Sequence, residues 1–208
     1  VPQYAVTTSL SCDGNLNTFR YLEKKRGVPF TFLDVPYGDD EASVEYLAGQ
    51  LEEFTAELER RFGRRFEEDK LKEALRIENE TRKELMRFFQ LQSEYYYPGE
   101  LISHLYMMMG MHLLIGTQEF LDLIRYMIEE IKTYPKYEGK KILWVHLLPF
   151  YQESLNQCFN GSRDYQIIAS DIILDFVEEL DPEKPFIRWP KRSSATCTMA
   201  PTSIRLRW

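Results

Sequence analysis

Two short apolar runs enclose one helical segment near the start of the chain, and this order leaves few folds open. Residues 4–10 and 29–35 are rich in β-branched and aromatic side chains, which is typical of strands. Residues 16–26 carry apolar side chains at helical spacing, and Gly27 stands where a glycine commonly ends a helix. A strand, a helix and a second strand predict a βαβ unit, whose parallel strands are joined by a right-handed crossover.

Cys12 follows the first predicted strand, at the edge of the sheet where open α/β proteins bind their ligands. A cysteine at this place is a candidate metal ligand or nucleophile, and its alternative role is that of a small buried apolar side chain. Five further residues lie near the same edge and are candidates for positions close to a site, without a catalytic role: Asp13, Asn15, Asp34, Pro36 and Tyr37. The first two have an alternative role as helix caps, and Asp-x-Pro after a strand is also ordinary turn chemistry.

Helical periodicity dominates residues 41–138. Apolar side chains recur there every three or four residues, which predicts several amphipathic helices. Gly63 is expected to end the first of these helices, and Thr117 is expected to cap the N-terminus of the last. We interpret the region as a helical connector.

An α/β pattern returns after this connector. Residues 141–148 predict a buried strand that Pro149 ends, and residues 165–169 predict a second strand, with short helices over 151–159 and 172–180. The predicted fold class is therefore α/β, in three parts: the end of one Rossmann-like parallel-sheet domain (1–40), the helical connector (41–138) and the start of a second Rossmann-like domain (139–186).

Residues 187–208 differ in composition from the rest of the chain. They hold five basic residues, no acidic ones and two of the three tryptophans, and they show neither a helical nor a strand period. We interpret this segment as an aberrant, disordered tail, and a basic interaction arm is the alternative.

Charge and composition exclude several classes of function. A net charge of −7 argues against nucleic-acid binding, which normally requires a basic face. No segment is long and apolar enough to span a membrane, and no signal peptide is recognisable. The three cysteines are too far apart for a disulfide framework, so we expect a reducing, cytoplasmic location, and Cys158 is expected to lie in the core. His104, His112 and His146 are too scattered to predict a zinc site.

Several segments resemble the 2-hydroxyacyl-CoA dehydratase subunits, which are relatives of the benzoyl-CoA reductase subunits. The resemblance runs from about Tyr4 to Phe186 and rests on Ser11-Cys12-Asp13-Gly14-Asn15 and on the stretches at 30–37, 44–51, 63–71, 141–146 and 180–185. It implies two α/β domains around a cleft, in which three cysteines per subunit hold a [4Fe-4S] cluster. It also implies a paralogous partner subunit, an ATP-dependent activator protein that delivers one electron, and an acyl-CoA substrate that loses water through a ketyl radical.

Within this resemblance Cys12 matches the second of the three cluster cysteines. The first would precede Val1 and the third would follow Phe186, so we expect a fragment truncated at both ends and inactive by itself. Cys158 and Cys197 match no cluster position. Two alternatives stay open: an electron-transfer subunit like those of benzoyl-CoA reductase, and a non-catalytic module that binds a partner through residues 101–115.

Overall fold

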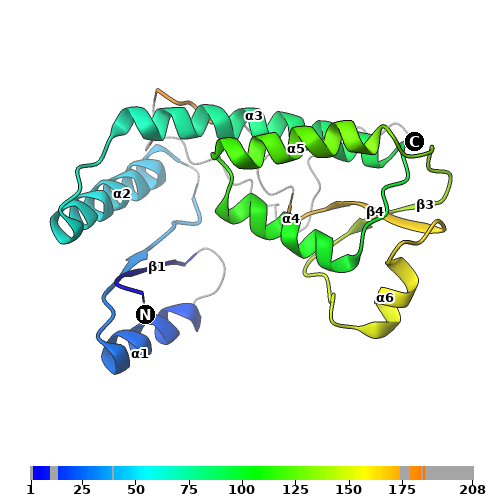
Figure 1. The fold of residues 1–208 in the computed structure, drawn as a ribbon. Helices are drawn as coiled ribbons and strands as arrows, with labels where there is room; N and C mark the ends of the chain where they lie inside the picture. Colours follow the sequence, from blue (N-terminus) through cyan, green and yellow to red (C-terminus); the bar gives the residue numbers. More distant parts are fainter. Residues whose placement is uncertain (1, 10–13, 39, 174–178, 184, 186–208) are drawn as a thin grey trace. The chain divides into compact units, whose positions relative to one another are not determined.

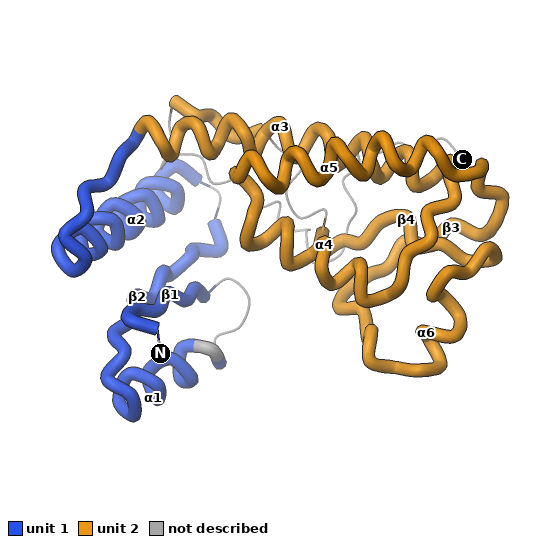
Figure 2. Tube along the Cα trace, viewed as in Figure 1, with its two compact units in different colours: residues 1–68, 184–197 blue, residues 69–183, 198–208 orange. Residues whose placement is uncertain are grey.

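A computed structural model describes residues 2–9, 14–38, 40–173, 179–183 and 185 of the chain (Figure 1). The described residues fall into two compact units (Figure 2). Among the described residues, unit 1 comprises those up to residue 68 together with residue 185, and unit 2 comprises those from residue 69 to residue 183. Both units combine helices with parallel strands, which confirms the predicted α/β class.

Unit 1 contains the predicted βαβ unit. Its elements are β1 (Ala5–Thr8), α1 (Gly14–Arg26), β2 (Phe30–Leu33) and α2 (Glu41–Phe62). The two strands pair in parallel, from Ala5 opposite Phe30 to Thr8 opposite Leu33. Both strands are shorter than the predicted runs, because pairing covers four residues of each. Gly27 has a φ of 66°, a left-handed conformation that glycine adopts without strain and that ends α1 as expected.

Local chemistry sets both ends of α2. The carboxylate of Asp40 accepts a hydrogen bond from the backbone N–H of Ser43. Hydrogen bonds from the backbone and the side chain of Ser43 hold the pKa of Asp40 below its usual value. At the other end Gly63 has a φ of 63° and donates its N–H to the carbonyl of Glu59. The prediction that Gly63 ends this helix is confirmed.

Unit 2 is built from three longer helices and a two-stranded parallel sheet (Figure 1). Its elements are α3 (Glu68–Gln92), α4 (Leu101–Leu113), α5 (Gln118–Ile131), β3 (Lys140–Trp144), α6 (Glu153–Phe159) and β4 (Tyr165–Ser170). Side chains from α3, α4 and α5 form one apolar core, together with Ile173 beyond β4. Its buried members are Leu85, Phe88, Phe89, Met111, Phe120, Ile124, Ile128, Ile131 and Ile173.

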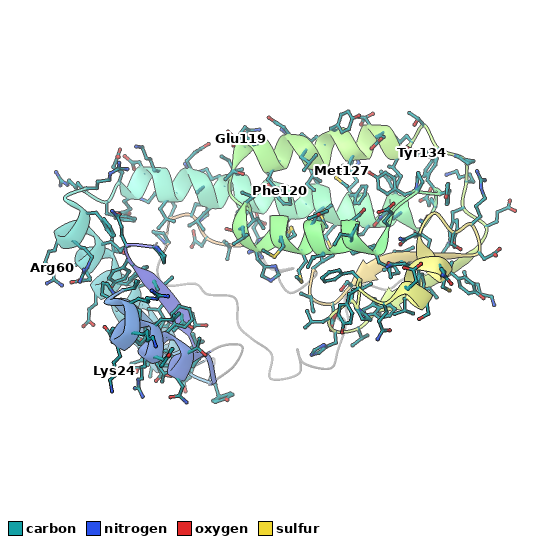
Figure 3. The ribbon with its side chains drawn as sticks, turned by 60° about the horizontal axis from the view of Figure 1, so that its bottom comes forward. Lys24, Arg60, Glu119, Phe120, Met127 and Tyr134 are labelled. Atoms are coloured by element: carbon teal, nitrogen blue, oxygen red, sulfur yellow. The ribbon has the colours of Figure 1, made fainter. Side chains whose placement is uncertain are left out.

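A short connection joins α4 to α5 and brings the two helices close together. The hydroxyl of Thr117 accepts a hydrogen bond from the N–H of Phe120, which confirms the predicted cap of α5. The ring of Phe120, labelled on α5 in Figure 3, lies against Gly110 of α4. A Cβ at position 110 would stand 2.5 Å from Cε2 of that ring, so the close approach requires a glycine.

The second sheet differs from its prediction in one respect. β3 ends at Trp144 and is exposed or half-buried along its length, with Leu143 at 46% exposure. The prediction of a buried strand over 141–148 is therefore wrong, because β3 has one described neighbour, β4, and its apolar side chains have no second layer among the described residues. β4 is the more buried strand, with Ile167 and Ile168 in the interior. Of the helix predicted over 172–180, residues 174–178 lie outside the described part of the chain.

Candidate functional site

The carboxyl ends of β1 and β2 meet at one edge of the unit 1 sheet. Thr8 lies opposite Leu33, and the N–H of Ser9 donates to the carbonyl of Leu33 at 3.1 Å. The hydroxyl of Ser9 then accepts from the N–H of Val35 at 2.8 Å and donates to the carbonyl of the same residue at 3.3 Å. The segments that leave the two strands therefore start side by side, as the sequence predicted.

Cys12 and Asp13 lie outside the described residues, and so does the side chain of Asn15, whose backbone belongs to the first turn of α1. Cys12 follows Ser9 by three positions in the sequence. The described geometry therefore places the start of the segment that carries Cys12, and the role of Cys12 itself stays a prediction.

Asp34 follows β2 directly and is held by α2. The side-chain amide of Gln50 accepts from the backbone N–H of Asp34 at 2.8 Å and donates to its carbonyl at 2.8 Å. The hydroxyl of Tyr46 donates to the Asp34 carboxylate at 3.2 Å, and this bond raises the pKa of Tyr46. Asp34 is exposed, and these three bonds fasten the end of β2 to α2.

Pro36 and Tyr37 continue from the same end of β2. Pro36 is half-buried, whereas the side chain of Tyr37 is 97% exposed. An aromatic side chain that remains in solvent beside a sheet edge is available for contact with a ligand or with another protein. The structure thus brings Asp34, Pro36 and Tyr37 to the expected edge.

Unit 2 presents a second carboxyl edge, which sequence reasoning did not single out. Trp144 at the end of β3 lies opposite Ser170 at the end of β4. Two residues later His146 has a φ of 73°, a left-handed conformation that is uncommon for histidine. The carboxylate of Asp171 accepts from the N–H of His146 at 2.8 Å and from that of Ile172 at 2.9 Å, and this holds the turn in place.

A cavity of about 170 Å³ opens at this second edge. Helix α4, the loop after β3 and the end of β4 form its wall. The lining residues are His104, Leu105, Met108, His146, Leu147, Leu148, Pro149, Phe150, Tyr151, Ser170, Ile172 and Ile173. Burial lowers the pKa of His104 to about 4, so its imidazole is neutral at pH 7.

Two of the three histidines line the same cavity, and the third does not. His104 and His146 line the same cavity although 42 positions separate them in the sequence. Nδ1 of His112 lies 2.8 Å from the carbonyl of Met108, one turn earlier on α4. Spacing in the sequence could not reveal the first pair, because a tertiary contact between α4 and the loop after β3 creates it.

Cys158 lies exposed on α6, and the prediction that it belongs to the core is wrong. The neighbouring Phe159 packs edge-on against Trp144 and Tyr165, with ring centroids 6.0 and 6.2 Å away. Helical geometry then turns the preceding residue away from that contact.

None of the described helices is long and apolar enough to cross a membrane.

Comparison with known proteins identifies the relatives of the chain. The family model of the 2-hydroxyglutaryl-CoA dehydratase D-component matches residues 2–207. The (R)-phenyllactyl-CoA dehydratase alpha subunit of Clostridium sporogenes is 20% identical over 201 residues, which cover 86% of this chain and 49% of that protein. The alpha subunit of (R)-2-hydroxyglutaryl-CoA dehydratase from Acidaminococcus fermentans is 25% identical over 87 residues, covering 40% of this chain and 18% of that protein. The chain thus spans about half the length of the first relative.

Proposed function

The chain belongs to the 2-hydroxyglutaryl-CoA dehydratase D-component family, and we propose that it forms part of a subunit that removes water from a 2-hydroxyacyl-CoA. The reaction proposed is a radical, iron–sulfur-dependent elimination. Its partners would be a paralogous subunit and an ATP-dependent activator protein that delivers one electron. The names of the two relatives, both alpha subunits of dehydratases that act on acyl-CoA thioesters, support this class of substrate.

The observation that carries the proposal is the geometry of the unit 1 edge. The Ser9–Val35 hydrogen bonds join the ends of two parallel strands, and Cys12 follows Ser9 by three positions. Ligands of open α/β sheets bind beyond this edge. This edge is where a metal-ligating thiolate is expected, and that expectation supports Cys12 as a ligand.

Asp34 and Tyr37 have different roles in this proposal. The backbone and carboxylate of Asp34 are engaged by Gln50 and Tyr46, so Asp34 orients the end of β2 and is a positioning residue. Tyr37, exposed at the same end, is the residue we expect to contact the thioester or the partner subunit.

The thiolates of this chain do not by themselves fit a [4Fe-4S] cluster. Several cysteine thiolates hold such a cluster, whereas Cys12 is the single cysteine among residues 1–68. Cys158 lies exposed on a helix of the other unit. We therefore propose Cys12 as one ligand among several, and no step of the reaction is assigned to residues of this chain through the cluster.

Iron content tests the proposal. In the complete subunit, purified anaerobically, Cys12→Ala should lower iron and acid-labile sulfide per chain and weaken the broad visible absorption of the cluster. Cys158→Ala is the matched control, because replacing this exposed cysteine should leave the iron content, the sulfide content and the visible absorption unchanged. Equal iron and sulfide in wild type and Cys12→Ala would remove Cys12 from the ligand set.

The packing of α4 bears on the alternative of a helical interaction module. Leu101, Gly110 and Met111 of this helix are buried within unit 2, and Met107 and Met108 pack against the same core. This packing supports α4 as a structural helix. A reductase-like subunit would use the same scaffold, and assays of water loss from a 2-hydroxyacyl-CoA and of reduction of an aromatic acyl-CoA distinguish the two reactions.

A further inference from the structure

The cavity at the carboxyl edge of β3 and β4 combines an apolar wall with an open rim. Leucine, isoleucine, methionine and proline side chains supply most of its wall. Leu147 and Tyr151 at the rim are 61% and 75% exposed, so the cavity is accessible from solvent. Its volume of about 170 Å³ compares with the cavity of about 150 Å³ that binds one benzene molecule in an engineered apolar core. A single aromatic ring or a short branched alkyl group therefore fits.

Four polar side chains interrupt this apolar wall: His104, His146, Tyr151 and Ser170. Ser170 is 3% exposed, and its hydroxyl forms no hydrogen bond with any residue in the described part of the chain. His104 is half-buried and is likewise without a hydrogen-bond partner among the described residues. The hydroxyl of Ser170 can therefore donate a hydrogen bond to an oxygen atom of a ligand in the cavity.

The wall contains no lysine, arginine, aspartate or glutamate among its described residues. His104 is neutral at pH 7, because burial lowers its pKa to about 4. Asp171, next to the cavity, is occupied by the backbone N–H groups of His146 and Ile172. A ligand carboxylate would therefore lose its hydration without meeting a lysine or arginine among the described lining residues.

The rim is held in a defined shape. His146 keeps its left-handed backbone because Asp171 accepts its N–H, and uncommon backbone conformations of this kind concentrate at ligand-binding sites. The pairing of β3 with β4 skips Ile168 of β4 between Ile142 and Leu143, so the register shifts just before this turn. The hydrogen bond from His146 to Asp171 thus holds one part of the rim in a defined conformation.

We propose that this cavity binds an uncharged group, a single aromatic ring or a short branched alkyl chain, that carries a hydroxyl or carbonyl oxygen toward Ser170 and His104. The acyl part of a thioester has this combination of an apolar chain and a carbonyl oxygen. The assignment of the bound group as the acyl substituent of an acyl-CoA rests on the proposed function. The binding of uncharged ring compounds to the cavity does not depend on that function.

Two matched probes test the proposal on the full chain: 3-phenylpropanamide, which is uncharged, and 3-phenylpropanoate, which carries a carboxylate at pH 7. The chain has three histidines, so their ring proton signals are separable by NMR, and His104→Gln identifies the signal of His104. The amide should shift this signal and leave that of His112 in place. The carboxylate should bind at least about tenfold more weakly.

Ser170→Ala should weaken binding of the amide about fivefold, the effect of one lost hydrogen bond. Ser154→Ala is the matched control, because Ser154 is exposed on α6 and does not line the cavity. Thermal unfolding of each variant verifies that it is folded. Three results would overturn the proposal: an unshifted His104 signal, equal affinities of Ser170→Ala and Ser154→Ala, or a carboxylate that binds as well as the amide. None of these readings depends on iron, so failure here is distinct from failure of the Cys12 proposal.

Discussion

Replacing Gly110 by alanine tests the closest helix contact of unit 2. In an exposed helix this change would stabilise the fold by about 1 kcal/mol, because glycine is a poor helix former. At position 110 the new Cβ would stand 2.5 Å from Cε2 and 3.0 Å from Cζ of Phe120. Carbon atoms in contact prefer about 3.5–4.0 Å, so α4 and α5 would have to separate by roughly 1 Å.

The expected change in the free energy of unfolding of Gly110→Ala follows from two opposing effects. Phe120 is 3% exposed and belongs to the core, so the ring has little room to move. Overpacking of a buried site costs about 1–3 kcal/mol, and the gain in helix propensity offsets about 1 kcal/mol of it. We expect Gly110→Ala to lower the free energy of unfolding by about 1–2 kcal/mol.

Urea denaturation of the full chain, followed by circular dichroism, measures this change. Gly49→Ala is the matched control: Gly49 lies in α2, and a Cβ there would meet no atom within 4 Å. This variant should be more stable than wild type by about 0.5–1 kcal/mol.

A double variant separates overpacking from other causes. Phe120→Leu shortens the side chain, so Gly110→Ala should be tolerated better in that background, with a favourable coupling of about 1 kcal/mol. If Gly110→Ala is as stabilising as Gly49→Ala, or if the coupling is absent, the contact between α4 and Phe120 is not the reason for the glycine.

Three further changes probe individual contacts. The pKa of His104 is about 4 in the folded chain and about 6.5 when unfolded, so the unfolded state takes up a proton first as the pH falls. Stability should be lower at about pH 5 than at about pH 8 by up to about 2 kcal/mol, and His104→Gln should remove this loss when urea denaturation is measured at both pH values. Asn79 is 7% exposed and bonds both the carbonyl and the N–H of Leu180, at 2.7 and 2.8 Å, so Asn79→Ala should cost about 2–3 kcal/mol by the same assay. Gln50→Ala removes both bonds to the Asp34 backbone at an exposed site and should cost about 1 kcal/mol, visible as faster hydrogen exchange of the Asp34 N–H.

Features set by neighbouring residues could be predicted from the sequence, and features set by distant contacts could not. Gly63 and Thr117 end and start their helices as predicted, because capping depends on one side chain or one backbone angle. The exposure of Leu143 depends instead on how many strands and helices cover β3. His104 and His146 line one cavity although 42 positions separate them in the sequence, and no local pattern predicts this.

The two sheet edges differ in chemistry, and this difference allows the two proposals to be separated. The unit 1 edge is polar and exposed, and Gln50 binds the backbone of Asp34 there. Cys12 follows Ser9 of this edge by three positions in the sequence. The unit 2 edge holds a largely apolar cavity whose polar lining residues include Ser170 and His104, which is neutral at pH 7.

If the unit 1 edge binds metal and the unit 2 edge binds an uncharged group, a substitution at one edge should leave the binding measured at the other edge unchanged. Cys12→Ala should lose iron and keep the amide-induced shift of the His104 signal, whereas Ser170→Ala should keep iron and bind the amide about fivefold more weakly. Loss of both readings in either variant would show that the change acts through general unfolding, since Cys12 and Ser170 belong to different units.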